Sequence, residues 1–569
     1  MKRLNPLVFI CIALLLRSQV AWAAIPATAQ WEVRIGGADT NGGGFVYGVG
    51  GKDVTAAADL TMDATVNTRM ASATYACVAG DAYKYINVTA GTNWRAGWYQ
   101  VLSCTGSSFN THVSPSAAGN ANLGTYDLYS SVDYSQNGDA PISLTDVAST
   151  AASAVITSVT KPFTGLMPGN IVQMTATGTG AHCALGFYQI TVYTDASTVT
   201  VDRAVDDGTD CVAGSLTIKA PLATPGMAGG AHAGGNTIWL RHNATPFAAT
   251  STSSNVTGGR VTLATGTAGA PTIIRGYETI RGDETSNRPT FAWGVNAASA
   301  YLITAAALTR LSNLILDGVR ATYTSTRGIT TATSPVMLYK VKLLNFAGVA
   351  VAIAATGLIC DQCELTNNAT QSMSITTGTL RLFHSYVHDN PYNAIEVTTG
   401  ALFLSGNIFA TNKSTTSYSA VVVTGTGIVV AENNTIYNSG SHGFDLQVAA
   451  TAYLANNHFE LNGGYGLNVG AMSPMVQMVS SSGYGNTSGN YTVANLPVRN
   501  VVDFKALTAS PLTSPTTGDF SLNSTAAGLE LRGTGAPQTF PGGTTISRRD
   551  IGAAQHLEIP GARRLVIVQ

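Results

Sequence analysis

The 569-residue sequence predicts an all-β protein built mainly from a parallel β-helix, with three short strands in each coil of about 22 residues, preceded by a duplicated small β module. Two observations lead to this prediction. From about residue 310 onward apolar residues recur in columns at a nearly constant step, and nearer the N-terminus two segments match at a fixed offset. The composition agrees, because only 11% of the residues are charged and 60 are Gly, which argues against a disordered chain.

The apolar columns define the coils. One steps by 22, 22, 22, 27 and 23 residues and consists of Leu343, Leu365, Val387, Phe409, Ile436 and Phe459. A second steps by 22, 22, 26, 23 and 23 residues and consists of Ile353, Ile375, Val397, Val423, Leu446 and Val469. A third contains Leu358, Leu380 and Leu402. Because side chains alternate along a strand, stacked coils with parallel strands bury a continuous core that one coil alone could not.

Two further columns contain asparagine and serine beside the strands. The first comprises Ser385, Asn407, Asn434 and Asn457, and the second comprises Asn368, Asn390, Asn412, Ser439 and Asn462. Asparagine tolerates left-handed backbone at turns and forms amide ladders between stacked strands, which favours a structural role. The 27-residue step carries an insertion near 413–419, which we expect to form a loop on one face.

The N-terminal region contains an internal duplication. Gly80-Asp81 followed by Gly97-Trp98-Tyr99-Gln100 matches Gly169-Asn170 followed by Gly186-Phe187-Tyr188-Gln189, at an offset of 89 residues. Short runs rich in Thr, Val and Tyr predict two all-β modules, at 31–130 and 131–220. Packing against a sheet is favoured for their aromatic residues, and sugar stacking is the alternative. The stretch 221–235 is typical of a flexible linker, and the β-helix is assigned to about 236–500.

The first residues have the form of a secretion signal. Lys2 and Arg3 precede an apolar run from Pro6 to Leu16, and Ala21-Trp22-Ala23 has the small-x-small pattern of a cleavage site. We assign 1–23 to a signal peptide, with an uncleaved anchor as the alternative. No later apolar segment approaches the about 20 residues needed to cross a bilayer, so no transmembrane span is expected after cleavage. The protein is therefore predicted to be secreted or held at the cell surface.

Disulfides are compatible with export. The chain has seven cysteines, of which Cys11 would leave with the signal. Each expected pair lies within one copy of the duplication, joining Cys77 to Cys104 and Cys183 to Cys211. Cys360 and Cys363 have the CxxC spacing, but no second pair and no histidine at zinc-finger spacing accompany them. A core thiol or a small structural disulfide is therefore favoured over a redox or zinc site.

The charge pattern argues against a nucleic-acid partner. Lys and Arg total 30 against 31 Asp and Glu, for a formal net charge of −1, and no basic stripe is present in the sequence. Nucleotide-binding, zincin and Gly-x-Ser-x-Gly signatures are missing from the sequence as well. No cofactor and no metal site are predicted from the residues alone.

The coil pattern over about residues 236–500 resembles the right-handed parallel β-helix repeat proteins of the pectate-lyase-like (pectin lyase fold) superfamily. The segments Gly518-Asp519-Phe520-Ser521-Leu522 and Asp550-Ile551-Gly552-Ala553-Ala554-Gln555 resemble a closing signature of exported bacterial and some phage-associated β-helix proteins, and we expect 501–569 to cap the terminal coil. The superfamily includes polysaccharide lyases and hydrolases, tailspikes and adhesins. The resemblance therefore implies a right-handed helix with a glycan-facing surface, without implying one reaction. Lyases of this fold bind calcium through acidic residues, so calcium as a cofactor is suggested by the resemblance alone.

Two carboxylates form the best candidate catalytic pair. Glu396 and Asp445 belong to one outward column, which reads Ser374, Glu396, Val422, Asp445 and Asn468. Two strand spacings of ~4.8 Å would place their Cα atoms about 10 Å apart, near the upper limit for an inverting glycosidase. The pair permits acid–base catalysis, although two carboxylates on a solvated sheet face need no function. The coils contain no acidic cluster with an adjacent Arg of the kind used by lyases.

Two other outward columns carry candidate ligand-binding residues. One contains His388, Tyr437 and Glu460, and the other contains Arg381, Phe403 and Tyr453. Aromatic and hydrogen-bonding side chains spaced along a stiff face suit a linear sugar chain, because sugar rings stack on apolar faces while polar groups fix their orientation. Ordinary solvated surface is the alternative for each residue.

These observations predict an exported β-helix protein that binds a polysaccharide or cell-surface glycan through an outward face of the helix. The alternative is a polysaccharide lyase or glycoside hydrolase that acts on an acidic or neutral polysaccharide. A further alternative is a phage-derived spike or structural component, with which a signal peptide agrees poorly.

Overall fold

A computed structural model gives the structure of the chain. It describes residues 30–36, 52–78, 81, 85–94, 97–111, 115–116, 118–120, 122–129, 142–163, 167, 171–206, 208–218, 222–226, 228, 232, 234–278, 282–297, 299–331, 335–354, 356–412, 417–447, 450–470, 475–492, 499–536, 550–553, 555–558 and 565–568. The predicted signal peptide at 1–23 lies outside these residues. The chain forms two compact units, which divide within the strand Met373–Ile375 (β26) and are treated separately below.

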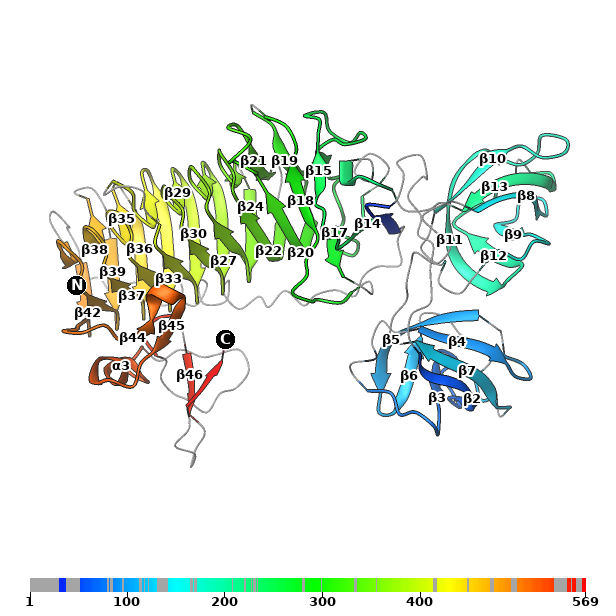
Figure 1. Cartoon of the computed structure of the whole chain (residues 1–569), viewed down its shortest axis with the longest axis horizontal. Helices are drawn as coiled ribbons and strands as arrows, with labels where there is room; N and C mark the ends of the chain where they lie inside the picture. The colour runs from blue at the N-terminus through cyan, green and yellow to red at the C-terminus, as the bar shows by residue number, and fades with distance from the viewer. Residues whose placement is uncertain are drawn as a thin grey trace. The chain divides into compact units, whose positions relative to one another are not determined.

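The first unit, Ala27–Met373, begins with two closed six-stranded barrels (Figure 1). The first barrel consists of β2 (Lys52–Met62), β3 (Arg69–Ala71), β4 (Tyr85–Ala90), β5 (Gly97–Thr105), β6 (Ser108–Thr111) and β7 (Gly124–Tyr129). The second consists of β8 (Ile142–Ser149), β9 (Val155–Thr157), β10 (Ile171–Ala176), β11 (Gly186–Asp195), β12 (Thr198–Val201) and β13 (Cys211–Ile218). If the six strands of each barrel are numbered 1 to 6 along the chain, both barrels have the circular order 1-2-5-4-3-6. The duplication seen in the sequence therefore extends to the strand topology.

The barrels are filled by their own apolar side chains and closed by disulfides. Tyr99 and Tyr188 are buried, as the core interpretation predicts, whereas the side chains of Trp98 and Phe187 lie outside the described part. The expected disulfides Cys77–Cys104 and Cys183–Cys211 are both present. The two disulfides occupy different positions in their barrels, because Cys104 lies in β5 whereas Cys211 is the first residue of β13. The disulfides therefore do not follow the duplication.

The first coil of the same unit contains a strand that the sequence analysis assigned to the first module. β1 (Gln30–Val33) pairs in parallel with β14 (Thr237–Arg241), and the Trp31 indole donates to Asn236 Oδ1 at 2.9 Å. The expected linker 221–235 also differs from the prediction where the structure describes it. Leu222 exchanges backbone hydrogen bonds with the β1 segment, and the His232 ring accepts the Ala264 N–H at 2.9 Å. These contacts hold the segment against the coils.

The remaining strands of this unit form parallel coils. They are β15 (Phe247–Ala249), β16 (Val261–Thr262), β17 (Thr272–Tyr277), β18 (Thr290–Trp293), β19 (Tyr301–Ala305), β20 (Thr309–Asp317), β21 (Arg327–Thr331), β22 (Val336–Leu344), β23 (Val351–Ile353), β24 (Thr356–Asp361) and β25 (Glu364–Thr366). The pairings described among them are parallel, and each joins a strand to its counterpart in the next coil. Cys360 and Cys363 are buried and joined by a disulfide, which was one of the two structural roles expected for them.

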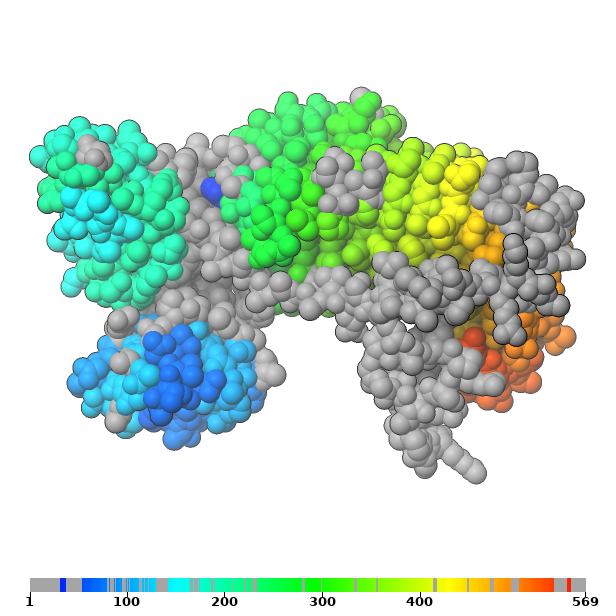
Figure 2. Space-filling view, turned by 180° about the vertical axis from the view of Figure 1, so that it is seen from behind, coloured from blue at the N-terminus to red at the C-terminus, as the bar shows by residue number. Residues whose placement is uncertain are grey.

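The second unit, which includes Ser374–Gln569, stacks its coils in three parallel ladders. Ladder A contains β27 (Gly378–Phe383), β30 (Gly400–Ser405), β33 (Gly427–Glu432), β36 (Thr451–Ala455), β39 (Met475–Val479) and β42 (Arg499–Val502). Ladder B contains β28 (Tyr386–His388), β31 (Ile408–Ala410), β34 (Thr435–Tyr437), β37 (His458–Glu460), β40 (Ser482–Tyr484) and β43 (Lys505–Ala506). Ladder C contains β29 (Ile395–Val397), β32 (Val421–Val423), β35 (Phe444–Leu446), β38 (Tyr465–Val469) and β41 (Gly489–Tyr491). Figure 2 shows these coils as successive bands of colour from yellow-green to orange.

The predicted apolar columns form the core of the coils. Val387, Phe409, Ile436 and Phe459 are register partners in ladder B, and all four are fully buried. The residues of the second column are register partners in ladder C and are at most 3% exposed, namely Val397, Val423, Leu446 and Val469. The fold class predicted from the column spacing, three strands per coil around a continuous core, is therefore confirmed.

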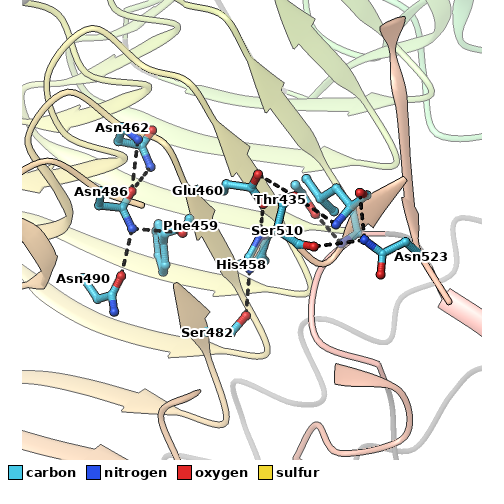
Figure 3. A network of polar contacts seen from close by, with 12 residues as sticks. Thr435, His458, Phe459, Glu460, Asn462, Ser482, Asn486, Asn490, Ser510 and Asn523 are labelled. Carbon is cyan, nitrogen blue, oxygen red and sulfur yellow. Dashed lines mark hydrogen bonds and ion pairs between the residues drawn. The ribbon is translucent and has the colours of Figure 1, made fainter. Parts of the chain in front are cut away.

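The predicted asparagine columns form hydrogen-bonded ladders inside the turns. Asn434 accepts from the Asn407 side chain at 3.0 Å and donates to Asn457 Oδ1 at 2.9 Å. A second ladder includes Asn462, whose amide donates to Asn486 Oδ1 at 2.7 Å (Figure 3). The left-handed residue is the one before each ladder position, as at Asn433 and Leu461 with φ of 55° and 54°. Here the structure differs from the expectation that the ladder residues themselves would be left-handed.

The C-terminal part docks on the side of ladder B. It contains β44 (Leu512–Ser514), the 3-10 helix η2 (Pro515–Thr517), β45 (Asp519–Leu522), α3 (Ala526–Leu531) and the hairpin of β46 (Gln555–Glu558) and β47 (Leu565–Val568). Its apolar residues share one buried cluster with the outward residues of ladder B, which comprises Ala410, Tyr437, Leu507, Leu512, Phe520, Leu522, Leu531 and Ile551. The described part of the expected cap thus covers a lateral face. Among the described residues, no helix is long and apolar enough to cross a membrane.

Replacing one ladder asparagine tests how much the ladder stabilises the coils. Asn434→Ala leaves the Asn407 and Asn457 amide groups without their partner, and each buried unsatisfied group costs about 1–3 kcal/mol. We expect the free energy of unfolding, measured by urea denaturation, to fall by about 2–4 kcal/mol. The exposed Thr399→Ala variant of the same unit should change it by less than about 0.5 kcal/mol. An equal, small effect of both variants would mean that the ladder contributes little.

Candidate functional site

The outward face of ladder C brings the predicted catalytic carboxylates into one column. Glu396 pairs in register with Val422, and Val422 pairs with Asp445, so the carboxylates lie two coils apart as predicted. Asp445 accepts from Asn468 Nδ2 at Oδ1 and from Gln447 Nε2 at Oδ2, both at 2.8 Å. These two amides hold Asp445 as a fixed hydrogen-bond acceptor.

Glu396 is more accessible than Asp445. Its side chain is partly exposed and accepts from Asn393 Nδ2 at 3.3 Å, whereas Asp445 is 7% exposed. Val422 separates the two carboxylates and is itself 5% exposed. The ladder therefore offers one accessible carboxylate and one buried, amide-bound carboxylate on the same face.

Aromatic rings line the turn that leads into ladder C. The Tyr392 and Tyr418 ring centroids lie 3.8 Å apart with the ring planes tilted by 35°, and the His442 and Tyr465 rings stack at 5.8 Å between centroids. All four side chains are partly exposed. They come from four consecutive coils and lie two or three residues before the register partners Ile395, Val421, Phe444 and Leu467, and Tyr465 is itself the first residue of β38.

The four rings and the two carboxylates are together called the ladder C strip. It comprises Tyr392, Tyr418, His442, Tyr465, Glu396 and Asp445. The sequence analysis did not select the four ring-bearing residues, because it followed strand positions only. The signal was available, since counting back from Ile395, Val421, Phe444 and Leu467 reaches all four rings. The insertion before Tyr418 breaks the even spacing and conceals this alignment.

His442 is held as a neutral ring within the strip. Its Nδ1 accepts the Tyr465 backbone N–H at 2.9 Å, which leaves the ring proton on Nε2. Burial lowers the pKa of His442 below its usual 6.5, and the negative charge of Asp445 opposes this shift. Gly464 makes room for the ring, because a Cβ there would lie 2.5 Å from Nδ1. His442 can therefore donate a hydrogen bond from Nε2 at neutral pH.

Tyr392 and Tyr418 are coupled through their hydroxyl groups as well as their rings. The hydrogen bond with Tyr418, together with partial burial and the charge of Glu396, raises the pKa of Tyr392 above its ordinary value. The Tyr392 hydroxyl therefore remains protonated at neutral pH and can donate or accept a hydrogen bond.

The predicted column of Arg381, Phe403 and Tyr453 lies on the outward face of ladder A. Arg381 and Phe403 are register partners, with the guanidinium carbon 5.1 Å from the ring centroid. Val430, which is 3% exposed, separates Phe403 from Tyr453. Burial, followed by the charge of Glu432, raises the pKa of Tyr453. The column is thus contiguous, but its aromatic groups are divided by a buried aliphatic residue.

The predicted column of His388, Tyr437 and Glu460 lies beneath the C-terminal part. The Phe520 ring packs edge-on against Tyr437 at 5.8 Å, and the two predicted ligand residues Tyr437 and Glu460 are 4% and 0% exposed. His388 stacks on Tyr386 at 3.9 Å and pairs with Asp389 at 2.7 Å. The expectation of an exposed column does not hold for Tyr437 and Glu460, because apolar residues after 506 cover them.

Glu460 instead takes part in a buried polar network (Figure 3). His458 Nε2 contacts Glu460 Oε2 at 2.9 Å and His458 Nδ1 contacts Ser482 Oγ at 2.8 Å, while the Ser510 hydroxyl donates to Glu460 Oε1 at 2.8 Å. The Ala553 N–H donates to Thr435 Oγ1 on the same ladder. These contacts attach the C-terminal part to ladder B, which makes Glu460 a structural residue.

A further group of metal-ligand side chains occurs in the first barrel. Cys77, Asp81 and Cys104 have donor atoms within 4.8 Å of one another. The two cysteines are joined as a disulfide, and Asp81 accepts from the Tyr75 hydroxyl at 3.0 Å and the Val78 N–H at 2.8 Å. The group therefore supplies no thiolate and acts as a structural cross-link.

The titration of His442 tests the electrostatics of the strip. Asp445→Asn removes the charge that opposes desolvation, so the pKa of His442 should fall further, as measured by histidine ring NMR. Asp389→Asn, beside His388, is the matched control and should leave the His442 titration unchanged. Because burial depresses the pKa of His442 in the folded state, the neutral His442 ring contributes stability above pH 6.5, and this stability is lost as the pH falls through the folded-state pKa. A pKa above 6.5 would contradict this account.

Comparisons with known proteins give one family match and several similar solved structures. Residues 382–496 match the family model of a right-handed β-helix region. The pectate lyase Pel9A has a TM-score of 0.40 at 14% identity, covering 59% of this chain and 91% of that chain. The A-module of the Azotobacter vinelandii mannuronan C-5 epimerase AlgE6 has a TM-score of 0.25 at 13% identity, covering 48% of this chain and 91% of that one. A glycoside hydrolase has a TM-score of 0.25 at 9% identity, covering 82% and 76%.

The sequence has no match among the curated proteins. The family match covers coils whose strands pair in parallel, each with its counterpart in the next coil. This combination identifies residues 382–496 as a right-handed parallel β-helix region.

Proposed function

We propose that this chain is an exported protein that binds a polysaccharide or cell-surface glycan through the ladder C strip. The observation that carries the proposal is the gathering of four partly exposed rings and an accessible carboxylate from consecutive coils on one face. Sugar rings present apolar faces that stack on aromatic rings and hydroxyl groups that bond to carboxylates and amides. The strip supplies both kinds of contact.

The spacing of the coils suits an extended chain ligand. Neighbouring parallel strands lie about 4.8 Å apart, so the four coils that supply the rings extend over about 14 Å along the ladder. Backbone hydrogen bonds between the coils hold the ring-bearing turns in place, as between Ser441 N–H and the Tyr418 carbonyl at 2.7 Å. A rigid aromatic surface loses little conformational entropy when it binds.

Export is part of the proposal. The N-terminal sequence has the pattern of a signal peptide, and all six cysteines after it are joined in three disulfides. Disulfides persist in oxidising compartments and are rare in the cytosol, which supports a secreted or surface location. Calcium use follows only from the family resemblance and is not needed for the proposed contacts.

A second candidate function, glycoside hydrolysis, is favoured by one observation, the shared outward column of Glu396 and Asp445. Two strand spacings place their Cα atoms about 10 Å apart, near the upper limit of the about 6.5–9.5 Å that separates the two carboxyl groups in inverting enzymes. Both carboxylate oxygens of Asp445 also accept hydrogen bonds from amide groups, which orients Asp445 as an acceptor rather than as a proton donor. Binding without cleavage is therefore the function that the geometry supports better.

Removing the stacked rings tests the binding proposal. A glycan retained by the chain in a polysaccharide pull-down should bind Tyr392→Ala or Tyr418→Ala about fivefold more weakly, because loss of an aromatic platform costs about 1 kcal/mol. Tyr453→Ala, on ladder A, is the matched control and should bind as the unmodified chain does. Weaker binding by Tyr453→Ala alone would move the site to the Arg381 and Phe403 face.

A separate assay tests the hydrolase alternative. If the carboxylate pair is catalytic, the chain should release new reducing ends from a bound polysaccharide, and Glu396→Gln or Asp445→Asn should reduce the rate at least 100-fold. We expect no release by the unmodified chain. Product formation that depends on both residues would replace the binding proposal with a catalytic one.

A further inference from the structure

His442 lies near two groups that favour opposite protonation states of its ring. The first is the Tyr465 backbone N–H, which donates to Nδ1 at 2.9 Å and therefore needs a bare nitrogen there. The second is the carboxylate of Asp445 in β35, whose negative charge favours a protonated ring. A titratable side chain of the ladder C strip thus has two alternative states.

A second proton on the His442 ring is incompatible with the contact to Tyr465. An imidazolium ring carries an N–H at both nitrogens and has no acceptor. Its Nδ1–H would point at the Tyr465 N–H, so the hydrogen bond would be lost and two donors would face each other. Turning the ring over restores no acceptor, because it places the Cδ2–H group at the same position. The protonated ring therefore has to leave its stacked position beside Tyr465.

The backbone of His442 is fixed, so this movement belongs to the ring and to Tyr465. The His442 N–H donates to Ser419 Oγ at 3.1 Å, and the His442 carbonyl accepts from the Ala420 N–H at 3.1 Å. Tyr465 is the first residue of β38, and its N–H has Nδ1 of His442 as its acceptor. Protonation therefore disturbs two of the four rings of the strip, His442 and Tyr465, together.

The other groups around His442 do not reverse the direction of this effect. Burial outweighs the charge of Asp445 and holds the pKa of His442 below its usual 6.5. Tyr418 and Tyr465 come from the coils before and after His442 and carry phenol groups. Lys413 lies outside the described residues, and a cation near the ring would move its titration to lower pH without changing the sign.

We infer that the ladder C strip releases its glycan in mildly acidic solution, because the Tyr465 N–H leaves no place for a second proton on the His442 ring. This inference rests on the proposed function and specifies how that site is regulated. Above pH 6.5 the ring is neutral and the strip is intact. A ligand that binds the neutral form alone loses affinity in proportion to the fraction of neutral rings, which amounts to about tenfold one pH unit below the pKa.

The experiment measures binding and protonation over the same pH series. Calorimetric titration gives the affinity of the full chain for galactomannan, xyloglucan and polygalacturonate from about pH 8 to about pH 5, where none of these polymers changes its charge. Histidine ring NMR follows the protonation of His442 in the free chain. For a polymer whose binding depends on Tyr392, we expect the affinity to be halved at the pH at which half of the His442 rings are protonated.

Three variants assign the effect to the ring. His442→Asn places an amide oxygen at the position of Nδ1, since both atoms are bonded to Cγ, so it can accept the Tyr465 N–H without titrating. Its affinity should stay constant over the series. His384→Asn, at an exposed turn position with φ of 45°, is the matched control and should keep the original pH profile. Asp445→Asn should move the loss of affinity to lower pH.

The outcomes separate the inference from the proposed function. A His442 ring that stays neutral to the acid end of the series, or an affinity that stays constant while the ring titrates, would overturn the inference while the binding site stands. An acid-induced loss that persists in His442→Asn would overturn it as well. If His442→Asn binds too weakly to measure, an unshifted loss in Asp445→Asn has the same meaning. If no polymer shows Tyr392-dependent binding at the alkaline end, the proposed function fails and the inference falls with it.

Discussion

The hydrogen-bonded stacking of one coil on the next, in fixed register, is the constraint on which the rest of the structure depends. Each ladder places one residue of every coil above its counterpart, so that Val387, Phe409 and Ile436 form a single buried column. A slip by one residue would turn this column outward and expose the core. The asparagine ladders oppose such a slip, because each amide reaches its partner only when neighbouring turns are aligned.

Because of the same register, side chains from successive coils form continuous outward surfaces although the sequence itself is irregular. Side chains that are 22 to 27 residues apart become neighbours on the outward faces, and the three faces differ in what they offer. Ladder B is covered by the C-terminal part, and ladder A has its aromatic residues divided by Val430. In ladder C, partly exposed rings lie beside carboxylates. The neutral His442 accepts a hydrogen bond from the Tyr465 backbone N–H, and the charge of Asp445 acts on its ring.

Much of this arrangement was predictable from the sequence, because the period of a solenoid is repeated in every coil. The columns ending at Phe459 and Val469, the asparagine ladders and the shared face of Glu396 and Asp445 all follow from the step length. The rings of Tyr392 and Tyr418 were missed, since turns lack the alternation of strands and an insertion shifts the second ring. The burial of Glu460 was also unpredictable, because it depends on a distant segment whose docking leaves no periodic signal.

A crystal structure of the full chain with a bound oligosaccharide tests the central claim most directly. The account predicts a sugar ring stacked over the Tyr392 and Tyr418 rings, with a hydroxyl group within hydrogen-bond distance of Glu396. A sugar found instead over Phe403 and Tyr453 on ladder A, with the ladder C strip vacant, would contradict the account while leaving the β-helix itself unchanged.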